Sequence, residues 1–162
     1  LHVASDNGQI GAIELLLDRG AGIESKDENG ETPLHVASDN GQIGAIGLLL
    51  DRGAVIEARD ADGRTPLHWA AASGQVGAIG LLLDRGAVIE ARTNDGETPL
   101  MVLARENHFD GVREFVSHVC FIPEPESQEF VAKGRKEMMV FMWIFKKYLK
   151  GRMPKEVWLR IG

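Results

Sequence analysis

Cysteine is nearly absent from this chain of 162 residues, which contains only Cys120. One thiol can form neither an intramolecular disulfide nor a cysteine-based zinc site, so the sequence excludes both as supports for the fold. Because scarce cysteine suits a reducing compartment, we expect a cytoplasmic protein.

Long apolar runs and aromatic residues are also scarce. The longest apolar run, 138–145, has eight residues, whereas a membrane-spanning helix needs about 20. Aromatic residues make up 6% of the chain, as expected for helical repeats whose cores are built from Leu, Ala and Ile. No secretory signal is visible. Leu1 is not a natural start of a chain, so we expect a fragment.

Positive charge is scarce in the first two-thirds of the chain. Residues 1–117 contain nine Lys and Arg against nineteen Asp and Glu, a net charge of −10. Residues 118–162 contain nine basic and five acidic residues, a net charge of +4. An acidic surface repels nucleic-acid phosphates, so we expect no nucleic-acid partner. The asymmetry is either ordinary solvated surface or a basic tail that docks on the acidic part.

A repeat of 33 residues is the main feature that the chain does contain. Thr32-Pro33-Leu34-His35 recurs as Thr65-Pro66-Leu67-His68 and as Thr98-Pro99-Leu100-Met101, and Leu1-His2-Val3-Ala4 is the same block without its Thr-Pro. Such a period indicates units that bury their apolar faces only by stacking on neighbours. Stacking produces an extended surface, which favours the binding of a partner.

The third unit shows the local structure that each repeat should form. Thr65 can cap a helix with its hydroxyl, and Pro66 follows at the first helical position, where no amide proton is needed. The small apolar residues after it predict a short helix that ends at Ser73-Gly74-Gln75. A second helix is predicted from Val76 to Asp84, because its apolar residues recur at helical spacing.

This helix–turn–helix–loop unit, with its Thr-Pro-Leu-His block, resembles the ankyrin repeat. The resemblance covers residues 1–117 and implies an all-α solenoid, with two layers of antiparallel helices and turns that project to one side. We expect about 3.5 repeats followed by a C-terminal helical extension. The predicted boundaries are 1–26 (partial repeat), 27–59 and 60–92 (complete repeats), 93–118 (degenerate repeat), 119–128 (linker) and 129–162 (helical tail).

Several residues depart from the ankyrin pattern. Val55 and Val88 replace the family's usual Asp, and Glu24, Glu57 and Glu90 replace its usual Asn. Glycines also lie within the second helices, where each costs roughly 1 kcal/mol relative to Ala. We therefore expect stacking, rather than helix propensity, to hold these helices. The glycines concerned are Gly44, Gly47, Gly77 and Gly80.

The tail has more than one interpretation. We expect a helix over 129–150 whose block 138–145 is apolar on every side, as in a buried helix. It would either cap the end of the array or bind a partner. Residues 153–162 are similar to the opening of an F-box, which implies a host-directed ankyrin protein, as in poxviruses or intracellular bacteria, and hence a host cytoplasm. A plain amphipathic terminal helix is the alternative.

We predict no metal site. His2, His35 and His68 recur every 33 residues, but stacked repeats place equivalent residues about 10 Å apart, too far to share one ion. The resemblance implies instead that this histidine bonds to the backbone of a neighbouring turn.

We also predict neither catalysis nor a cofactor. Cys120 could be paired with His108 or His118 as nucleophile and base, but no third group or oxyanion hole stands at a recognisable spacing. The recurring Asp-Arg pairs at 51–52 and 84–85 are interpreted as solvated charges.

The resemblance places partner contacts at the turn tips and on the exposed side of the first helices. By register, the expected contact residues are Lys26, Glu28, Asn29, Glu31, Asp39, Asn40, Arg59, Asp62, Arg64, Arg92, Asn94, Asp95, Glu97 and Arg105.

Two features of this surface have alternative interpretations. Lys26, Arg59 and Arg92 form a basic row. The row either binds a carboxylate-bearing partner or pairs with the aspartates at 62 and 95. Trp69 is a large aromatic residue in a first helix, and we expect it in the core rather than at the contact surface.

These inferences predict a non-enzymatic protein–protein interaction module that is monomeric and binds another protein, with no nucleic acid, membrane, metal or cofactor. One alternative is a substrate-recruiting adaptor of a ubiquitin ligase that acts through an F-box-like C-terminus. The other is a targeting or regulatory array of a larger enzyme.

Overall fold

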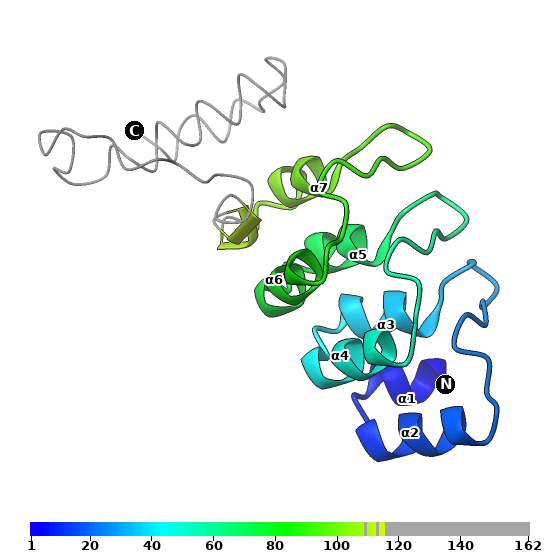
Figure 1. Ribbon diagram of the computed structural model, residues 1–162. Coiled ribbons are helices and arrows are strands. Elements are labelled where there is room, and N and C mark those ends of the chain that lie inside the picture. The colour runs from blue at the N-terminus through cyan, green and yellow to red at the C-terminus, as the bar shows by residue number, and fades with distance from the viewer. Residues whose placement is uncertain (109, 113, 116–162) are drawn as a thin grey trace, which may run out of the picture. The chain divides into compact units, whose positions relative to one another are not determined.

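The computed structural model describes residues 1–108, 110–112, 114 and 115, and these residues form an all-helical stack. Helices alternate along the chain between a first and a second helix of each repeat (Figure 1). The bounds are α1 (His2–Asp6), α2 (Ile10–Asp18), α3 (Pro33–Asp39), α4 (Ile43–Asp51), α5 (Pro66–Ala72), α6 (Val76–Asp84) and α7 (Pro99–Arg105). Residues 110–112, 114 and 115 are also helical.

The first helices begin where the sequence predicts. Thr32, Thr65 and Thr98 are extended residues at the N-caps of α3, α5 and α7, and each is followed by a proline at the start of the helix. The threonine has an extended backbone, and its hydroxyl oxygen can accept a hydrogen bond from a free amide of the first helical turn. The proline that follows has no amide hydrogen that would need an acceptor. The capping role predicted for Thr65 is confirmed.

The second helices also agree with the sequence, and α6 has the predicted bounds Val76–Asp84. Their apolar side chains form the core: Ile46, Leu49, Ile79 and Leu82 are fully buried. A glycine in the left-handed region follows each second helix, such as Gly86 at φ 89°. Because a side chain is strained at this φ, glycine ends the helix and turns the chain toward the next repeat.

Packing runs from repeat to repeat. First helices lie against first helices, with α3 between α1 and α5, and second helices lie against second helices, with α4 between α2 and α6 (Figure 1). Leu34 and Leu67 are almost completely buried between them. The two layers of paired helices confirm the predicted all-α architecture.

Two of the helical glycines have a packing role that the sequence did not reveal. A Cβ at Gly44 would lie 3.0 Å from Ile10 Cδ1, and a Cβ at Gly77 would lie 3.1 Å from Ile43 Cδ1. The isoleucine of one repeat thus lies over the glycine of the next. A Cβ at Gly47, by contrast, would meet nothing within 4 Å.

The unusual glutamates connect consecutive repeats. Glu24 Oε1 accepts a hydrogen bond of 2.9 Å from the amide of Val55, and Glu57 Oε1 accepts one of 2.8 Å from the amide of Val88. A glutamate is long enough to reach the backbone of the next repeat. Because the donor is a backbone amide, this bond does not depend on the valine side chain.

The chain divides by its contacts into two units, Leu1–Phe121 and Ile122–Gly162. The predicted linker at 119–128, the tail helix at 129–150 and the F-box-like segment at 153–162 lie outside the described residues. Within the described part of the chain, none of the helices has the length and apolar character required to cross a membrane.

Candidate functional site

The candidate site lies on the loops that lead into α3, α5 and α7. These three loops extend to the same side of the helix stack (Figure 1). Each ends in a threonine cap, so the position of a loop is fixed relative to the first helix that follows it.

Histidines fix each loop to the helix of the preceding repeat. Thr65 donates its amide to His68 Nδ1 at 3.2 Å, and His68 Nε2 lies 3.1 Å from the carbonyl oxygen of Glu97 in the next turn. Because Nδ1 accepts, the ring hydrogen is on Nε2, which donates to that carbonyl. His35 makes the same contact with the carbonyl of Arg64 at 3.1 Å. The structural role expected for this histidine is confirmed.

Burial keeps these rings neutral. His35 and His68 are almost completely buried, and burial lowers the pKa of both. The hydrogen bonds to backbone carbonyls raise the pKa of these rings, but by less than burial lowers it. A neutral ring is the form that this contact requires, since Nδ1 must accept a hydrogen bond.

The basic row is tied to the backbone of neighbouring turns. Lys26 Nζ donates to the carbonyl of Arg59 at 2.8 Å, and Arg59 Nη1 donates to the carbonyl of Arg92 at 2.7 Å and to that of Gly63 at 3.0 Å. Arg92 Nη1 donates to the carbonyl of Gly96 at 2.9 Å. The alternative in which this row pairs with the aspartates is therefore corrected: Lys26 and Arg59 link one turn to the next.

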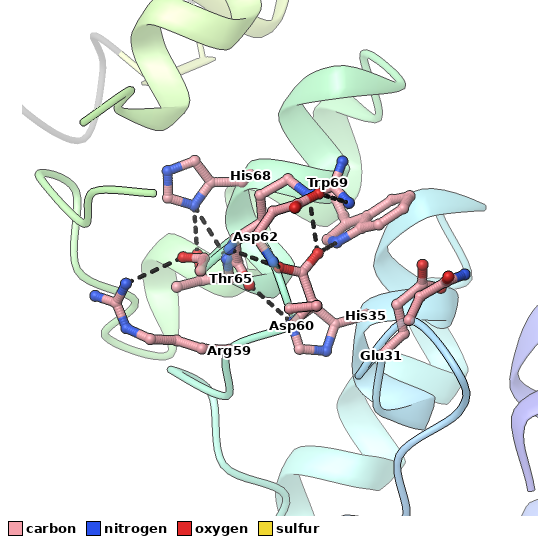
Figure 2. Close-up of polar contacts among 12 residues, drawn as sticks. Glu31, His35, Arg59, Asp60, Asp62, Thr65, His68 and Trp69 are labelled. Carbon is pink, nitrogen blue, oxygen red and sulfur yellow. Dashed lines mark hydrogen bonds and ion pairs between the residues drawn. The ribbon is translucent and has the colours of Figure 1, made fainter. Parts of the chain in front are cut away.

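Asp60 organises the turn of the third repeat (Figure 2). Its carboxylate accepts from the amides of Asp62 at 2.9 Å and Arg64 at 2.8 Å, from Arg64 Nε at 2.8 Å and from Trp69 Nε1 at 3.0 Å. Burial raises the pKa of Asp60, but the hydrogen bonds from Arg64 and Trp69 lower it more, and the net change is downward. The buried carboxylate thus stays ionised, because its charge is satisfied by four donors.

Arg64 and Trp69 form a pair that the second and fourth repeats lack. The guanidinium carbon lies 4.3 Å from the ring centroid, within the range of a cation–π contact. Arg64 also forms ion pairs with Asp60 at 2.8 Å and Asp62 at 2.9 Å. Both side chains are half-buried. The expectation that Trp69 belongs to the core is therefore wrong, because its ring is held at the edge of the core by Asp60.

Glu31 lies on the same face in the second repeat. Burial raises the pKa of Glu31, and the negative charge of Asp27 raises it further. The positive charge of nearby Arg64 lowers the pKa of Glu31, but by less than burial and Asp27 together raise it.

The ends of the first helices are joined in the same manner. Asn40 Nδ2 donates to Asp6 Oδ1 at 2.8 Å, and Ser73 Oγ donates to the carboxylate of Asp39 in the preceding repeat. In the fourth repeat, Arg105 pairs with Glu97 at 2.7 Å. These contacts fix the helix ends relative to one another along the candidate surface.

The predicted contact residues lie on the loops and helix ends that the register assigns to them. Four are half-buried: Glu31, Asp39, Arg64 and Glu97. The others are exposed: Lys26, Glu28, Asn29, Asn40, Arg59, Asp62, Arg92, Asn94, Asp95 and Arg105. The register did not identify Asp60 and Trp69 as part of this surface, although a lone tryptophan in a first helix was a usable signal.

The Asp-Arg pairs at the ends of the second helices differ from the prediction. Arg52 Nη1 lies 2.9 Å from Asp18 Oδ1, and Arg85 Nη1 lies 2.9 Å from Asp51 Oδ1. These residues are not merely solvated, because each arginine reaches the aspartate of the preceding repeat.

Within the described ranges, no three His, Cys, Asp or Glu side chains gather as metal ligands would. Many of the polar groups of the surface bond to one another or to the backbone, which fixes their positions. Cys120, the candidate nucleophile in the sequence, lies outside the described residues.

Comparison with known proteins agrees with this geometry. The model of ankyrin repeats (3 copies) matches residues 1–93, which is more than half of the chain. No match is found among curated proteins. Ankyrin repeats typically mediate protein–protein interactions, and no catalytic family is found. The repeat, its histidine contacts and this match together show that the chain belongs to the ankyrin-repeat family.

Proposed function

We propose that this chain is a non-enzymatic protein-binding module that contacts its partner through the turn tips and first-helix ends of the second to fourth repeats. The observation that supports this most is the tie between consecutive turns. Lys26 and Arg59 each donate a hydrogen bond to a backbone carbonyl of the next turn. His35 and His68, in the first helices, also bond to backbone carbonyls of the loop that follows. Loops held in this way lose little conformational freedom on binding.

Arg64 and Trp69 are the proposed centre of the contact surface. Interface hot spots are enriched in Trp and Arg, and these two side chains are stacked and half-buried. Their orientation is already fixed by Asp60, so a partner gains the contact without ordering either side chain. The exposed charges around them are better placed to select the partner than to supply affinity.

The partner is proposed to be another protein, and the module is proposed to act as a monomer. Narrower roles, such as a ubiquitin-ligase adaptor or the targeting array of an enzyme, would use the same surface. The segment that suggested the adaptor, 153–162, lies outside the described residues, so we do not assign that role.

Two single variants test the proposal once a partner has been captured and identified by cross-linking. Trp69→Val installs the residue found at the equivalent positions 36 and 102. It should weaken binding by about tenfold or more, since hot-spot truncations cost about 2 kcal/mol. Arg64→Ala should weaken binding by a similar factor. Calorimetric titration provides the dissociation constants.

Arg85→Ala is the matched control, because the Arg85 side chain is 39% exposed and that of Arg64 is 37% exposed. Arg85 forms an ion pair as Arg64 does, but its partner is Asp51 of the preceding repeat and the pair lies at the end of a second helix. It should leave the affinity within twofold of the parent, because only a change on the contact surface alters binding. If Arg85→Ala weakens binding while Arg64→Ala and Trp69→Val do not, the contact lies elsewhere.

A further inference from the structure

Three asparagines in this chain are followed by glycine: Asn7, Asn29 and Asn40. In an Asn-Gly pair the glycine amide nitrogen can attack the asparagine side-chain carbonyl, because glycine has no side chain to obstruct the approach. The three pairs share this local chemistry. The structure places them in very different surroundings.

We propose that Asn29 is a site of spontaneous deamidation in the folded chain, and that the fold protects Asn7 and Asn40. The amide nitrogen of Gly30 forms a bond to Asn29 Cγ and loses its proton. The bond between Cγ and Nδ2 breaks, and the nitrogen leaves as ammonia. Water then opens the cyclic imide at either carbonyl, which yields aspartate or isoaspartate at position 29.

Asn40 is protected by two helices. Its Nδ2 donates to Asp6 Oδ1 at 2.8 Å and to the carbonyl of Val36 at 3.1 Å. The residue lies between α3 and α4. Attack on Asn40 Cγ therefore requires its bond to Asp6 in the preceding repeat and its bond to Val36 within α3 to break.

Asn7 has the same sequence neighbours, and its amide is also engaged. Residues 5–13 and 38–46 are identical. Asn7 Nδ2 donates to the carbonyl of Val3 at 2.8 Å, and the residue lies between α1 and α2. Asn7 and Asn40 therefore have the same neighbours in sequence, and any difference between their deamidation rates must come from the structure around them.

Asn29 lies at the exposed tip of a turn, away from any helix. Its side chain hydrogen-bonds to the carboxylate of Glu31, a neighbour within the same loop. The Gly30 amide donates to the carbonyl of Asp27 at 3.1 Å, and the Asn29 amide donates to Asp27 Oδ1 at 2.9 Å. Attack requires this turn to open. Opening this turn leaves every helix intact, whereas opening around Asn40 disrupts the ends of α3 and α4, so we expect it to cost less free energy. The reactive conformation is therefore more populated at Asn29 than at Asn40.

The repeat indicates how each product would fit. Asp62 and Asp95 occupy the position equivalent to Asn29, so the backbone of such a turn accommodates aspartate. In the second repeat the new carboxylate would replace the hydrogen bond from Asn29 to Glu31. Isoaspartate would route the main chain through the former side chain and displace the carbonyl of residue 29. That carbonyl accepts a hydrogen bond of 3.0 Å from the amide of Ala61, so isoaspartate would loosen the contact between the second and third turns.

Incubation of the full chain at neutral pH, followed by mass spectrometry with fragmentation, tests the proposal. Conversion of each asparagine to the acid is measured over time in native buffer and in strong denaturant. In denaturant the three sites should convert at similar rates. In native buffer Asn29 should convert at least about tenfold faster than Asn40, in proportion to the populations of the open states.

Equal rates at Asn29 and Asn40 in native buffer would overturn the proposal, as would the absence of conversion at Asn29 while the denatured chain converts.

Discussion

Arg85 Nη1 lies 2.9 Å from the carboxylate of Asp51, a residue of the preceding repeat, and this ion pair repeats one period earlier between Arg52 and Asp18. The pairs join the ends of consecutive second helices. Their side chains are 38–39% exposed for the arginines and 64–67% exposed for the aspartates, so water screens the attraction.

A double-mutant cycle on Asp51→Ala and Arg85→Ala should therefore give a coupling free energy of about 0.5 kcal/mol. The coupling should shrink at high salt, because exposed charges are screened. Urea denaturation at two salt concentrations measures it. A coupling of several kcal/mol that resists salt would mean that the pair is desolvated, contrary to its exposure.

Gly47→Ala should stabilise the array by about 1 kcal/mol, because Gly47 lies inside α4 and its new methyl group would meet nothing within 4 Å. Gly44→Ala is the control in the same helix. Its methyl group would press on Ile10 Cδ1 at 3.0 Å, so it should gain less or lose stability. Midpoints of urea denaturation compare the two. An equal gain at both positions would show that Ile10 moves away at no cost.

Acid should destabilise the array through its buried histidines. Because burial lowers the pKa of His35 and His68, the folded state binds protons more weakly than the unfolded state does. Their contribution to stability is therefore fully present above the unfolded pKa of about 6.5 and is lost as pH falls through the lower folded pKa. The urea midpoint should decline between neutral pH and about pH 5.

His68→Met isolates this effect, since methionine occupies the equivalent position 101. The variant should be less stable at neutral pH, because the bond to the carbonyl of Glu97 is lost. Its midpoint should nevertheless depend less steeply on pH over the histidine range. An unchanged slope would show that other groups cause the acid sensitivity.

The sequence-based prediction for the tail also has a direct test. Residues 138–145 are apolar, and their sequence predicts either a cap on the end of the array or a partner-binding helix. If they are a cap, shortening the chain should have a measurable effect. A chain cut after Phe121, the end of the first unit, should have a lower thermal midpoint and bind more of a dye that reports exposed apolar surface. If the shortened chain is as stable and as monomeric as the parent, the segment is not a cap.

The elements of a single repeat could be predicted because their signals are local. The threonine cap, the proline after it and the apolar spacing of residues 76–84 are contained in one unit, and the structure has α6 at the predicted bounds. The all-α stack was implied by the resemblance of this unit to the ankyrin repeat.

Contacts between repeats were harder to predict, because they depend on the offset between stacked units. The reach of Arg85 to Asp51 spans 34 residues, and that of Arg59 to the carbonyl of Arg92 spans 33. Neither offset is visible within a single unit. Trp69 was misplaced for a related reason: hydrophobicity indicated the core, while the bond to Asp60 depends on how the loop folds back.

The contacts between repeats also have an evolutionary consequence. Glu24 and Glu57 make the same bond to the next repeat, as do His35 and His68 and the two Asp-Arg pairs. The boundary between the first and second repeats and the boundary between the second and third repeats therefore have the same complementary halves. A duplication or deletion of 33 residues would join two halves that already match, and the protein could gain or lose length without inventing a new interface. The identity of residues 5–13 and 38–46 is consistent with such a duplication event.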